Sequence, residues 1–456
     1  MEETIHLYFT SDLHSHFENW PKIIYSMNQE VEKHADEFHL LLDNGDHLDR
    51  SHSYTEATLG EANVRLLNEA GYHFATLGNN EGITLPEENL YRLYDEATFS
   101  VVCANIRPQN QDKPNWLTPY DVVQTEQGTK IGVIGLTAPF QLFYEKLGWE
   151  TYKPMDMLDV YMPEMQEQCD VIVLLSHLGA HQDEIIAENY PIDVIIGGHT
   201  HHLYNEAQIE SGTLINAVGK HGYYFGKIKL VFDHYENRIT KKEGHALPAG
   251  DKNDRQTEEL LEAIHQQADE QLSQPVAELT QNYSANWYME TDLMTGFVDE
   301  LKDWTNADCA MLNSGILLHG FSAGVVSRKD VHSSCPHPMN PCVMEMTGRE
   351  LLETVRMFEG RDFIDFELKG LGFRGKRIGK MIYANLTAET HDETDFIEKI
   401  YIGGEEVDPH RVYHVATADT FSFPSLVPTI ASVKEKHYFM PEFLRDVLAQ
   451  SLKKLS

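Results

Sequence analysis

Short apolar runs alternate with amphipathic stretches through the first half of the chain. Continuous runs such as VIVLL at 171–175 and VII at 194–196 are typical of strands that are buried on both faces of a sheet. Residues 56–70 (EATLGEANVRLLNEA) instead carry apolar side chains at helical spacing. This alternation predicts a layered α/β domain. The predicted strands lie at 5–10, 38–43, 74–77, 130–136, 171–175 and 194–196.

The pattern changes after a last strand-like run at 223–233. A polar stretch at 241–254 contains a Pro-Ala-Gly-Asp turn, and residues 257–272 have the pattern of an amphipathic helix with acidic residues in its first turn. We therefore expect a first domain at 1–250, a helical linker at 251–275 and a second domain at 276–456. The further elements predicted in the second domain are helices at 292–305 and 440–452 and strands at 309–312 and 413–417.

The charge of the chain limits its partners. Its 456 residues include 72 acidic and 36 basic ones, a formal net charge of -36. Such a surface repels nucleic-acid backbones and anionic membranes, and no apolar run approaches the roughly 20 residues that a membrane span needs. We therefore expect neither a nucleic-acid polymer nor a membrane as partner. A small phosphorylated substrate would need local positive charge, which bound divalent metals can provide.

The cysteines and the N-terminus indicate a cytoplasmic protein. There are five cysteines, an odd number without a CxxC pair, which fits reduced thiols better than a disulfide framework or a zinc ribbon. The acidic first residues, Met1 to Ile5, lack the basic start and apolar core of a secretory signal.

Metal-binding side chains follow five of the predicted strands. Ligands of α/β sheets bind beyond the carboxyl ends of the strands, so parallel strands would bring these groups to one edge. Seven groups exceed the needs of one tetrahedral ion, and their mixed nitrogen and oxygen ligation suits Mn, Zn, Fe or Co. We therefore expect two divalent metal ions that share a bridging carboxylate. The seven residues are Asp12, His14, Asp46, Asn79, His177, His199 and His201.

The order of these motifs resembles a known superfamily. The series Asp-x-His, Gly-Asp, Gly-Asn, Ser-His and Gly-Gly-His-Thr-His is similar to that of the calcineurin-like metallophosphoesterases. Over nearly the whole chain the arrangement resembles the bacterial 5'-nucleotidase branch, which includes UDP-sugar hydrolases and 2',3'-cyclic phosphodiesterases. In the second domain, Asn313-Ser314-Gly315 resembles the N-x-G signature of this branch, and residues 413–417 (YHVAT) resemble its Y-x-V-A-T strand.

The resemblance implies a fold, a ligand assignment and a chemistry. The fold is a metallophosphatase domain, a β-sandwich flanked by helices, followed by a smaller α/β domain that recognises the substrate. A water on the two ions would attack phosphorus in line, with no covalent enzyme intermediate. The resemblance places Asp12, His14, Asp46 and His201 on one ion and Asp46, Asn79, His177 and His199 on the other, with Asp46 bridging.

Two positions beside the metal-binding Asn79 depart from the family pattern. The family places a His directly after this Asn and an Asp three residues later, whereas this chain has Asn80 and Ile83. General acid–base catalysis of the kind that a His provides raises the reaction rate by about 10²–10⁴-fold. Asn can donate a hydrogen bond but cannot deliver a proton. We hypothesise that Asn80 contacts the substrate phosphoryl group. A slower reaction, a better leaving group or another histidine remain alternatives; the histidines near the ligands are His16, His47, His52 and His202.

The second domain holds the residues expected to bind the substrate. Asn313 and Gly315 come from the N-x-G signature, but the Arg that normally follows is Leu318 here. Residues 419–424 (DTFSFP) replace the Gly-Gly-Asp-Gly-aromatic loop of the family, so Phe421 or Phe423 either stacks on a base or packs in the core, and we take Phe423 as the candidate substrate contact. The basic segment 369–380 (KGLGFRGKRIGK) is either a substrate-anion contact or a solvated loop.

Three functions follow from these observations. The first is a two-metal phosphohydrolase that acts on nucleotides or related small phosphoesters. The second keeps the metals but acts as a phosphodiesterase or diphosphatase on sugar-nucleotide or non-nucleotide substrates. The third is a catalytically weak, metal-binding interaction protein, which the loss of the His, Asp and Arg favours and the complete ligand set opposes.

Overall fold

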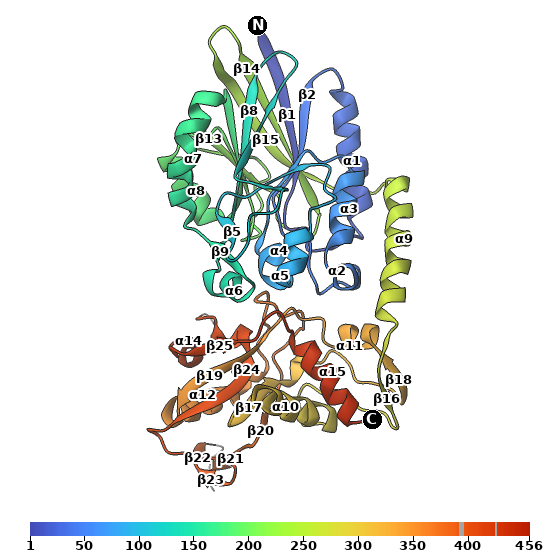
Figure 1. Cartoon of the computed structure of the whole chain (residues 1–456), viewed down its shortest axis with the longest axis vertical. Coiled ribbons are helices and arrows are strands. Elements are labelled where there is room, and N and C mark those ends of the chain that lie inside the picture. Colours follow the sequence, from blue (N-terminus) through green and yellow to red (C-terminus); the bar gives the residue numbers. More distant parts are fainter. Residues whose placement is uncertain (392–395, 425) are drawn as a thin grey trace. The chain divides into compact units, whose positions relative to one another are not determined.

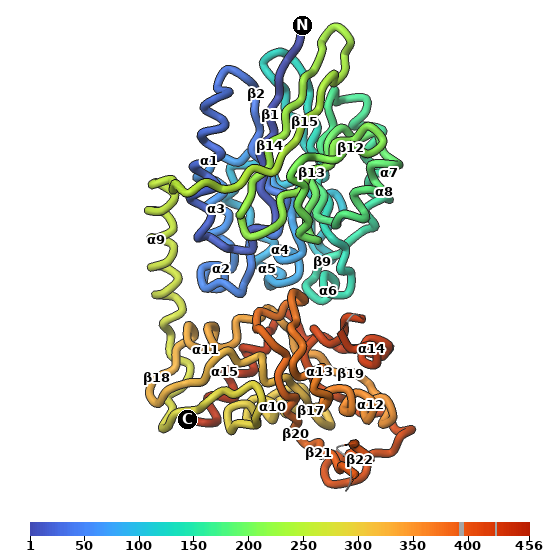
Figure 2. The backbone as a smooth tube through the Cα atoms, turned by 180° about the vertical axis from the view of Figure 1, so that it is seen from behind, coloured from blue at the N-terminus to red at the C-terminus, as the bar shows by residue number. Residues whose placement is uncertain are grey.

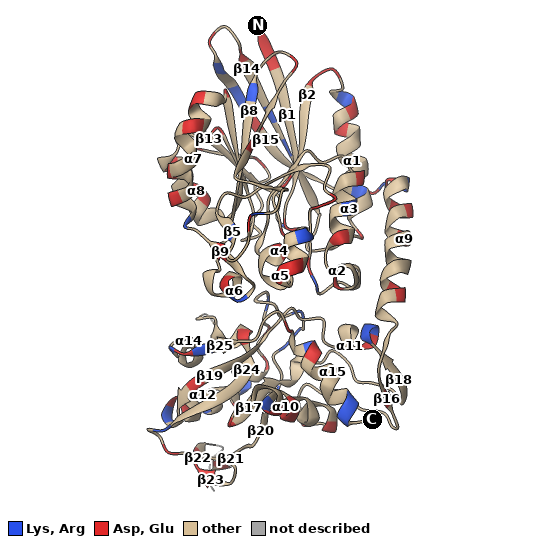
Figure 3. Ribbon diagram, in the orientation of Figure 1, with Lys and Arg blue, Asp and Glu red and all other residues tan. Residues whose placement is uncertain are grey.

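The computed structural model describes residues 1–391, 396–424 and 426–456 of the chain, which form two compact units. The first unit comprises Met1–Ala268 and the second Asp269–Ser456 (Figure 1). The chain passes from one to the other within helix α9 (Arg255–Leu272), which begins two residues before the predicted helix. Among the described residues, no helix is both long and apolar enough to cross a membrane. Asp and Glu residues are spread over the elements of both units (Figure 3).

Two mixed sheets form the centre of the first unit. The first sheet, in order across it, consists of β15 (Arg238–Pro248), β14 (Tyr224–Asp233), β1 (Glu2–Thr10), β2 (Phe38–Asp43), β3 (Phe74–Ala75), β4 (Ser100–Val102) and β6 (Leu117–Thr118). The second consists of β12 (Gln208–Glu210), β13 (Thr213–Ala217), β11 (Val194–Gly197), β10 (Val171–His177), β8 (Lys130–Thr137) and β7 (Tyr120–Gln124). A separate antiparallel pair joins β5 (Ile106–Pro108) to β9 (Trp149–Thr151).

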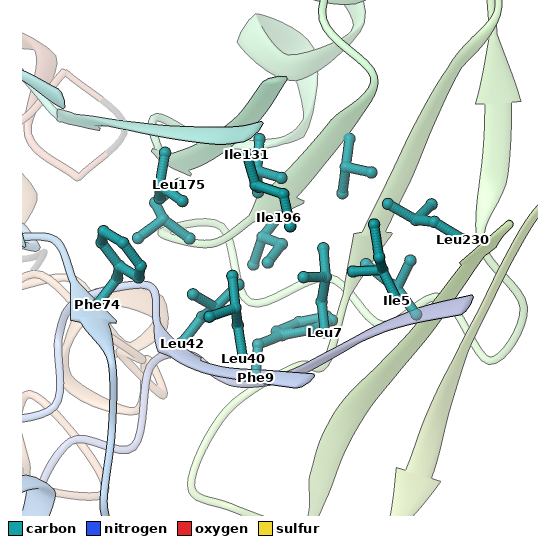
Figure 4. Packing of buried hydrophobic residues seen from close by; sticks show 14 of the residues in the cluster. Ile5, Leu7, Phe9, Leu40, Leu42, Phe74, Ile131, Leu175, Ile196 and Leu230 are labelled. Carbon is teal, nitrogen blue, oxygen red and sulfur yellow. The ribbon is translucent and has the colours of Figure 1, made fainter. Parts of the chain in front are cut away.

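The two sheets pack face to face around one apolar core. Alternate residues of β1, such as Ile5 and Leu7, meet residues of the second sheet such as Val173 and Leu175, and all are fully buried (Figure 4). The residues between them on β10, including Leu174, point to the other face and pack in a second core beneath helices. The run at 171–175 is therefore buried on both faces, as its sequence predicts.

Helices cover the outer faces of the sandwich. Figures 1 and 2 show α1 and α3 beside the first sheet and α7 and α8 beside the second. The layered α/β architecture expected from the sequence is thereby confirmed. The helices of this unit before α9 are α1 (Trp20–Lys33), α2 (Ser53–Thr58), α3 (Glu61–Glu69), α4 (Asn79–Thr84), α5 (Glu87–Arg92), α6 (Gln141–Lys146), α7 (Pro154–Gln168) and α8 (Ala180–Asn189).

The helical stretch predicted at 56–70 is interrupted. The structure places α2 before the break and α3 after it, because Leu59 and Gly60 both adopt left-handed backbone conformations, with φ of 49° and 91°. A Cβ on Gly60 would lie 2.9 Å from the side chain of Leu93, which directly follows α5. The bend therefore brings this turn close to the end of α5, where a glycine fits best. The hydrophobic spacing alone does not reveal such a break.

The second unit is a smaller α/β body around a five-stranded sheet. Its order is β20 (Met381–Ala384), β17 (Cys309–Asn313), β24 (Val412–Ala418), β19 (Pro341–Thr347) and β25 (Lys436–Tyr438). Two small sheets join β16 (Pro275–Leu279) to β18 (Gly324–Ser327), and β21 (Leu386–Thr390) to β22 (Ile397–Ile402) and β23 (Glu405–Glu406). Its helices are α10 (Asp292–Thr305), α11 (Arg328–Ser334), α12 (Gly348–Phe358), α13 (Arg361–Ile364), α14 (Pro428–Ala431) and α15 (Leu444–Lys454), with 3₁₀ turns η1 (Ser314–Ile316) and η2 (Asp419–Ser422).

The C-terminal helix begins later than the predicted residue 440. Asp446 accepts a hydrogen bond from the backbone N–H of Phe443 at 2.8 Å, and this contact caps the helix start. Pro441 lies in the segment before the cap, which the apolar pattern had included in the helix.

Candidate metal centre

The seven predicted ligands come together at the carboxyl ends of strands from both sheets. β1, β2 and β3 run parallel in the first sheet, and β10 and β11 run parallel in the second. The expectation of a single sheet edge was therefore wrong, since buried strand patterns do not show which sheet a strand joins. Asp12 and His14 follow β1, Asp46 follows β2, Asn79 begins α4 after β3, His177 ends β10, and His199 and His201 follow β11.

Three of these residues form one compact group. The Nε2 atoms of His14 and His201 lie 3.0 Å apart, and Asp12 Oδ1 lies 3.4 Å from His201 Nε2 and 3.9 Å from His14 Nε2. One nitrogen or oxygen from each residue therefore faces a common space, the arrangement that a single divalent ion needs.

A second group shares Asp12 with the first. His177 Nε2 lies 3.3 Å from Asp46 Oδ2 and 3.9 Å from Asp12 Oδ1. The opposite ring nitrogen, Nδ1, donates to the carbonyl oxygen of Asn44 at 2.8 Å, which orients the ring so that Nε2 faces the carboxylates. His177 Nε2 is buried and has no hydrogen-bond partner, as expected for a nitrogen that awaits a metal ion.

Asp46 and the Asn79–His199 pair complete the centre. Asp46 Oδ2 lies 3.7 Å from His14 Nε2 as well as 3.3 Å from His177 Nε2, so this carboxylate touches both groups. Asn79 Oδ1 lies 2.8 Å from His199 Nδ1, and the His199 ring stands 5.4 Å from that of His177. The donor set of imidazole nitrogens, carboxylates and one amide oxygen fits first-row divalent metals.

The backbone at the centre is held in an uncommon conformation. Five of the seven residues have left-handed φ values, between 49° and 67°: Asp12, His14, Asp46, His199 and His201. Non-glycine residues rarely adopt this region, and such positions cluster at functional sites. Gly78 adds a close approach, because a Cβ at this residue would lie 2.1 Å from Asp46 Oδ1.

Residues that the sequence did not single out hold the ligands in place. Glu81 accepts backbone N–H bonds from Asp46 at 2.9 Å, from Leu48 at 3.1 Å and from Gly78 at 2.8 Å. Asp49 Oδ2 lies 3.4 Å from His14 Nδ1, which turns His14 Nε2 toward the centre. The available signal was their position shortly after a predicted ligand: Glu81 follows Asn79 by two residues in GNNEG, and Asp49 follows Asp46 by three in GDHLD.

The carboxylates of the centre stabilise positive charge. Burial opposes ionisation of His177, but Asp46 and Asp12 outweigh it and raise the pKa of this histidine to about 10. Burial, followed by repulsion from Asp46, raises the pKa of Glu81 to about 7. The negative charge of Asp46 contributes to both shifts, and such charge in a buried space favours a bound cation.

Asn80 lies directly against the centre. It is 7% exposed, its backbone N–H donates to Asp46 Oδ1 at 2.7 Å, and its Nδ2 donates to Asp46 Oδ2 at 2.8 Å. Nδ2 also lies 3.3 Å from His14 Nδ1, whose proton is directed at Asp49. One hydrogen of the Asn80 amide is therefore used by Asp46, and the second is not needed by a ligand.

The other histidines near the ligands differ in their surroundings. His47 is buried against Trp20 and hydrogen-bonded to Asn63, so it belongs to the core. His16 stacks on His221 at 3.7 Å between ring centroids, and the His221 ring lies 6.0 Å from that of His14. His16 and His221 thus form a half-buried imidazole pair beside the centre.

The predicted substrate residues of the second unit lie in and near its central sheet. Asn313 is buried and donates to the carbonyl of Ile378 at 2.9 Å, while a Cβ on Gly315 would meet the Arg377 carbonyl at 2.0 Å. The N-x-G turn therefore packs against the basic segment 369–380. Phe423 is half-buried, whereas Phe421 is 1% exposed and packs with other aromatic rings in the core.

Known proteins share both parts of this chain. The family model for the calcineurin-like phosphoesterase matches residues 5–203, and the model for the 5'-nucleotidase C-terminal domain matches residues 271–423. The uncharacterized metallophosphoesterase YunD of Bacillus subtilis is 41% identical over 99% of this chain and 100% of its own. The 2',3'-cyclic-nucleotide 2'-phosphodiesterase/3'-nucleotidase of Haemophilus influenzae is 23% identical over 91% of this chain and 78% of its own.

Solved structures share the fold over almost the full length. The NAD nucleotidase of Haemophilus influenzae superposes with a TM-score of 0.70 at 18% identity, covering 99% of this chain and 96% of that one. A putative 5'-nucleotidase from Staphylococcus aureus gives 0.70 at 19% identity, covering 100% and 98%. The expected order of a metallophosphatase domain followed by a 5'-nucleotidase-type domain is confirmed.

Proposed function

The chain belongs to the calcineurin-like phosphoesterases that carry a 5'-nucleotidase C-terminal domain, and we propose that it is a two-metal phosphohydrolase for nucleotides or related small phosphoesters. The family is one of hydrolases that act on phosphoester bonds and use divalent metal ions. The observation that carries the proposal is the pair of ligand groups that share Asp12 and adjoin Asp46. Two cation positions beside each other suit an in-line displacement at phosphorus.

The proposed ligand sets are those that the family resemblance implies and have Asp46 in common, whereas the two compact groups of the structure have Asp12 in common. Asp12, His14, Asp46 and His201 would hold one ion, and Asp46, Asn79, His177 and His199 the other. Two ions bound there would neutralise phosphoryl oxygens and supply a nucleophilic water at neutral pH. The mixed nitrogen and oxygen donors favour Mn, Zn, Fe or Co.

The chain's own groups orient this chemistry. Asn80 fixes both oxygens of Asp46 through its backbone and side-chain N–H groups, and its remaining amide hydrogen is proposed to donate to a phosphoryl oxygen. Because Asn80 cannot deliver a proton, the leaving group must either depart unprotonated or receive a proton from elsewhere. The His16–His221 pair lies beside the ligand set, with the His221 ring centroid 6.0 Å from that of His14.

Recognition of the rest of the substrate is proposed for the second unit. Asn313, Gly315 and Phe423 keep their predicted role in substrate binding. A cavity of about 530 Å³ in this unit has Leu426, three residues after Phe423, in its lining, which combines guanidinium groups (Arg356, Arg361) with aromatic rings (Phe363, Phe366). Such a lining suits a flat aromatic group that carries negative charge.

The substrate class has two candidates. Nucleotides are favoured by the 5'-nucleotidase C-terminal domain. A cyclic phosphodiester or sugar nucleotide is the second candidate, supported by the similarity to a 2',3'-cyclic-nucleotide 2'-phosphodiesterase/3'-nucleotidase. Hydrolysis of a phosphodiester needs the same metal centre, so only the recognition of the substituents differs.

We further propose that the protein works in the cytoplasm. All five cysteines are free thiols, and four of them are buried. Free thiols without disulfides are typical of proteins in the reducing cytoplasm. Fractionation of cells that express the tagged protein tests this location.

A metal-dependence assay tests the proposed reaction. The purified protein, stripped with a chelator, should hydrolyse aryl phosphate mono- or diesters only after Mn²⁺ is restored, and Asp46→Asn should remain inactive in Mn²⁺. Turnover that is unaffected by chelator, or no turnover on either ester, would contradict the proposal. A panel of nucleotides, cyclic nucleotides and nucleotide sugars then separates the two substrate candidates.

A further inference from the structure

A second cluster of metal-binding side chains lies in the first unit, away from the candidate metal centre. His6 on β1, His34 at the C-terminal end of α1 and Glu37 before β2 place one ligand atom each within 4.8 Å of one another. His6 precedes the end of β1 by four residues, which is about 13 Å along an extended strand. The cluster therefore lies well separated from Asp12 and its neighbours.

The two imidazoles converge on one carboxylate oxygen. Glu37 Oε2 lies 2.6 Å from His6 Nε2 and 3.0 Å from His34 Nδ1. The two rings stack, with centroids 4.3 Å apart and planes inclined by 30°, so both ligand nitrogens point to the same side. His6 is fully buried, whereas His34 and Glu37 are about one-third exposed, which leaves the cluster open to solvent on one side.

We propose that His6, His34 and Glu37 form a further binding site for a zinc-like divalent cation. Two imidazoles and one carboxylate are a ligand set that zinc takes when one coordination position stays open to water. Ligand atoms on a tetrahedral zinc ion lie roughly 3.3 Å apart, so Glu37 Oε2 must move about 0.7 Å away from His6 Nε2 and about 0.3 Å away from His34 Nδ1. Its exposure, in the turn after α1, allows this movement.

The protonation states of the cluster suit this role. Burial lowers the pKa of His6, which keeps its ring neutral. Burial opposes ionisation of Glu37 as well, but the hydrogen bond from His6 and the neighbouring basic groups together outweigh it and lower the pKa of that carboxyl. A neutral imidazole and an ionised carboxylate are the forms that bind metals. The ion would replace the two N–H protons that Glu37 now accepts.

Lys227 on β14 contacts His34 and thereby opposes binding of the ion to this histidine. Its Nζ lies 3.3 Å from His34 Nε2 and 2.7 Å from Glu30 Oε2. While Lys227 donates to His34 Nε2, the ring proton stays on Nδ1, which is the atom that the ion needs. Metal binding moves that proton to Nε2, and Lys227 must then keep only its contact with Glu30. Removal of this lysine should therefore strengthen metal binding, a gain that damage to the fold would not produce.

The charged groups around the cluster otherwise balance. Glu30 and Glu37 face it from α1 and the following turn, and Lys227 and Lys229 face it from β14. A divalent cation would join the C-terminal end of α1 to β1. The site would thus stabilise this edge of the sandwich and take no part in the proposed hydrolysis.

Zinc content measured by mass spectrometry tests the site. After equilibration with Zn²⁺ and dialysis, the unchanged protein should retain one equivalent more than either His34→Ala or Glu37→Gln. The matched control is His234→Ala, which removes a histidine that lies 3.0 Å from a single carboxylate, Glu3, and it should retain as much zinc as the unchanged protein. Because all four proteins keep the candidate metal centre, the difference does not depend on the proposed function.

A competition titration with a chromophoric chelator completes the test. Lys227→Met should bind the additional Zn²⁺ on the order of tenfold more tightly than the unchanged protein, the size typical of a residue next to a metal ligand. Equal zinc contents in the unchanged protein, His34→Ala and Glu37→Gln would overturn the site. An unchanged affinity in Lys227→Met would overturn coordination by His34 Nδ1.

Discussion

His14 and His201 bring their Nε2 atoms within 3.0 Å of each other although 187 positions separate them in the chain. One follows a strand of the first sheet and the other a strand of the second. The proton of His14 is directed through Nδ1 to Asp49, so its Nε2 carries a lone pair. Two such nitrogens beside Asp12 are stabilised by a shared cation.

This relationship predicts opposite outcomes for two adjacent histidines. His201→Ala should lose one of the two ions and lower kcat/KM by more than about 100-fold. Replacing even a residue that only supports a metal ligand typically lowers metal affinity or activity by about 10–100-fold. His202→Ala removes the next imidazole, whose Nδ1 lies 3.0 Å from Thr200, and should keep both ions. Metal analysis and kinetics of both variants check this. Equal metal loss in both would contradict the assignment of His201.

The close approach of Gly78 to Asp46 gives a steric prediction. Gly78 has a φ of -87°, which any residue adopts, so Gly78→Ala adds no backbone strain. The new Cβ would displace Asp46 Oδ1, and a misplacement of about 1 Å at a reacting site costs on the order of 10² in rate. Gly296→Ala in α10 is the control, since its Cβ meets nothing closer than 3.4 Å. Full activity in Gly78→Ala, measured with Mn²⁺, would rule out this placement of Asp46.

Asn80 is expected to act on the rate of the chemical step. Asn80→Ala removes the side-chain donor to Asp46 and the amide hydrogen proposed for the phosphoryl group, and kcat should fall by about 10²-fold. Asn80→His restores the residue of the family pattern and should turn over substrates with poor leaving groups faster than Asn80→Ala. Comparison of aryl phosphates with good and poor leaving groups measures the effect. Unchanged kcat in both variants would refute a catalytic role.

His337 in the second unit predicts how stability changes with pH. It is fully buried, its Nε2–H donates to the Ile316 carbonyl at 2.8 Å, and its Nδ1 accepts the Arg374 N–H at 2.8 Å, so only the neutral ring satisfies both bonds. Burial lowers its pKa from 6.5 to about 3. Between pH 6.5 and 3 the unfolded chain therefore binds a proton on this histidine that the folded unit does not bind. In this range the free energy of unfolding should fall by up to about 1.4 kcal/mol per pH unit as the pH is lowered.

Denaturant unfolding across this pH range measures the effect. His337→Gln should be less stable at pH 7 but should lose less of its stability on acidification. His319→Gln, which changes a histidine with an exposed ring in the same unit, should follow the unchanged protein. Parallel pH profiles for the unchanged protein and His337→Gln would show that this imidazole is not the group that titrates.

The sequence predicts those features that depend on short-range pattern. The buried strands, the ligand motifs at their ends and α10 at 292–305 all follow from local periodicity and turn chemistry. The sequence pattern does not predict features that depend on tertiary contacts. These are the division of the strands between two sheets, the break at Leu59 and Gly60, and the support of Asp46 by Glu81. The position of Glu81 shortly after a predicted ligand could have made it a candidate, but only the coordinates show that it accepts the backbone N–H groups of Asp46, Leu48 and Gly78.

The origin of the ligands in two sheets has a consequence for how this enzyme responds to change. Asp12, Asp46 and Asn79 move with one layer of the sandwich, and His177, His199 and His201 with the other. The spacing of the ligands is therefore set by the thickness of the apolar core between the layers. A substitution deep in that core, such as Leu175→Ala, would change the distance between the layers and so the spacing of the proposed ligands. Ions bound at the proposed centre would in turn hold the two layers together.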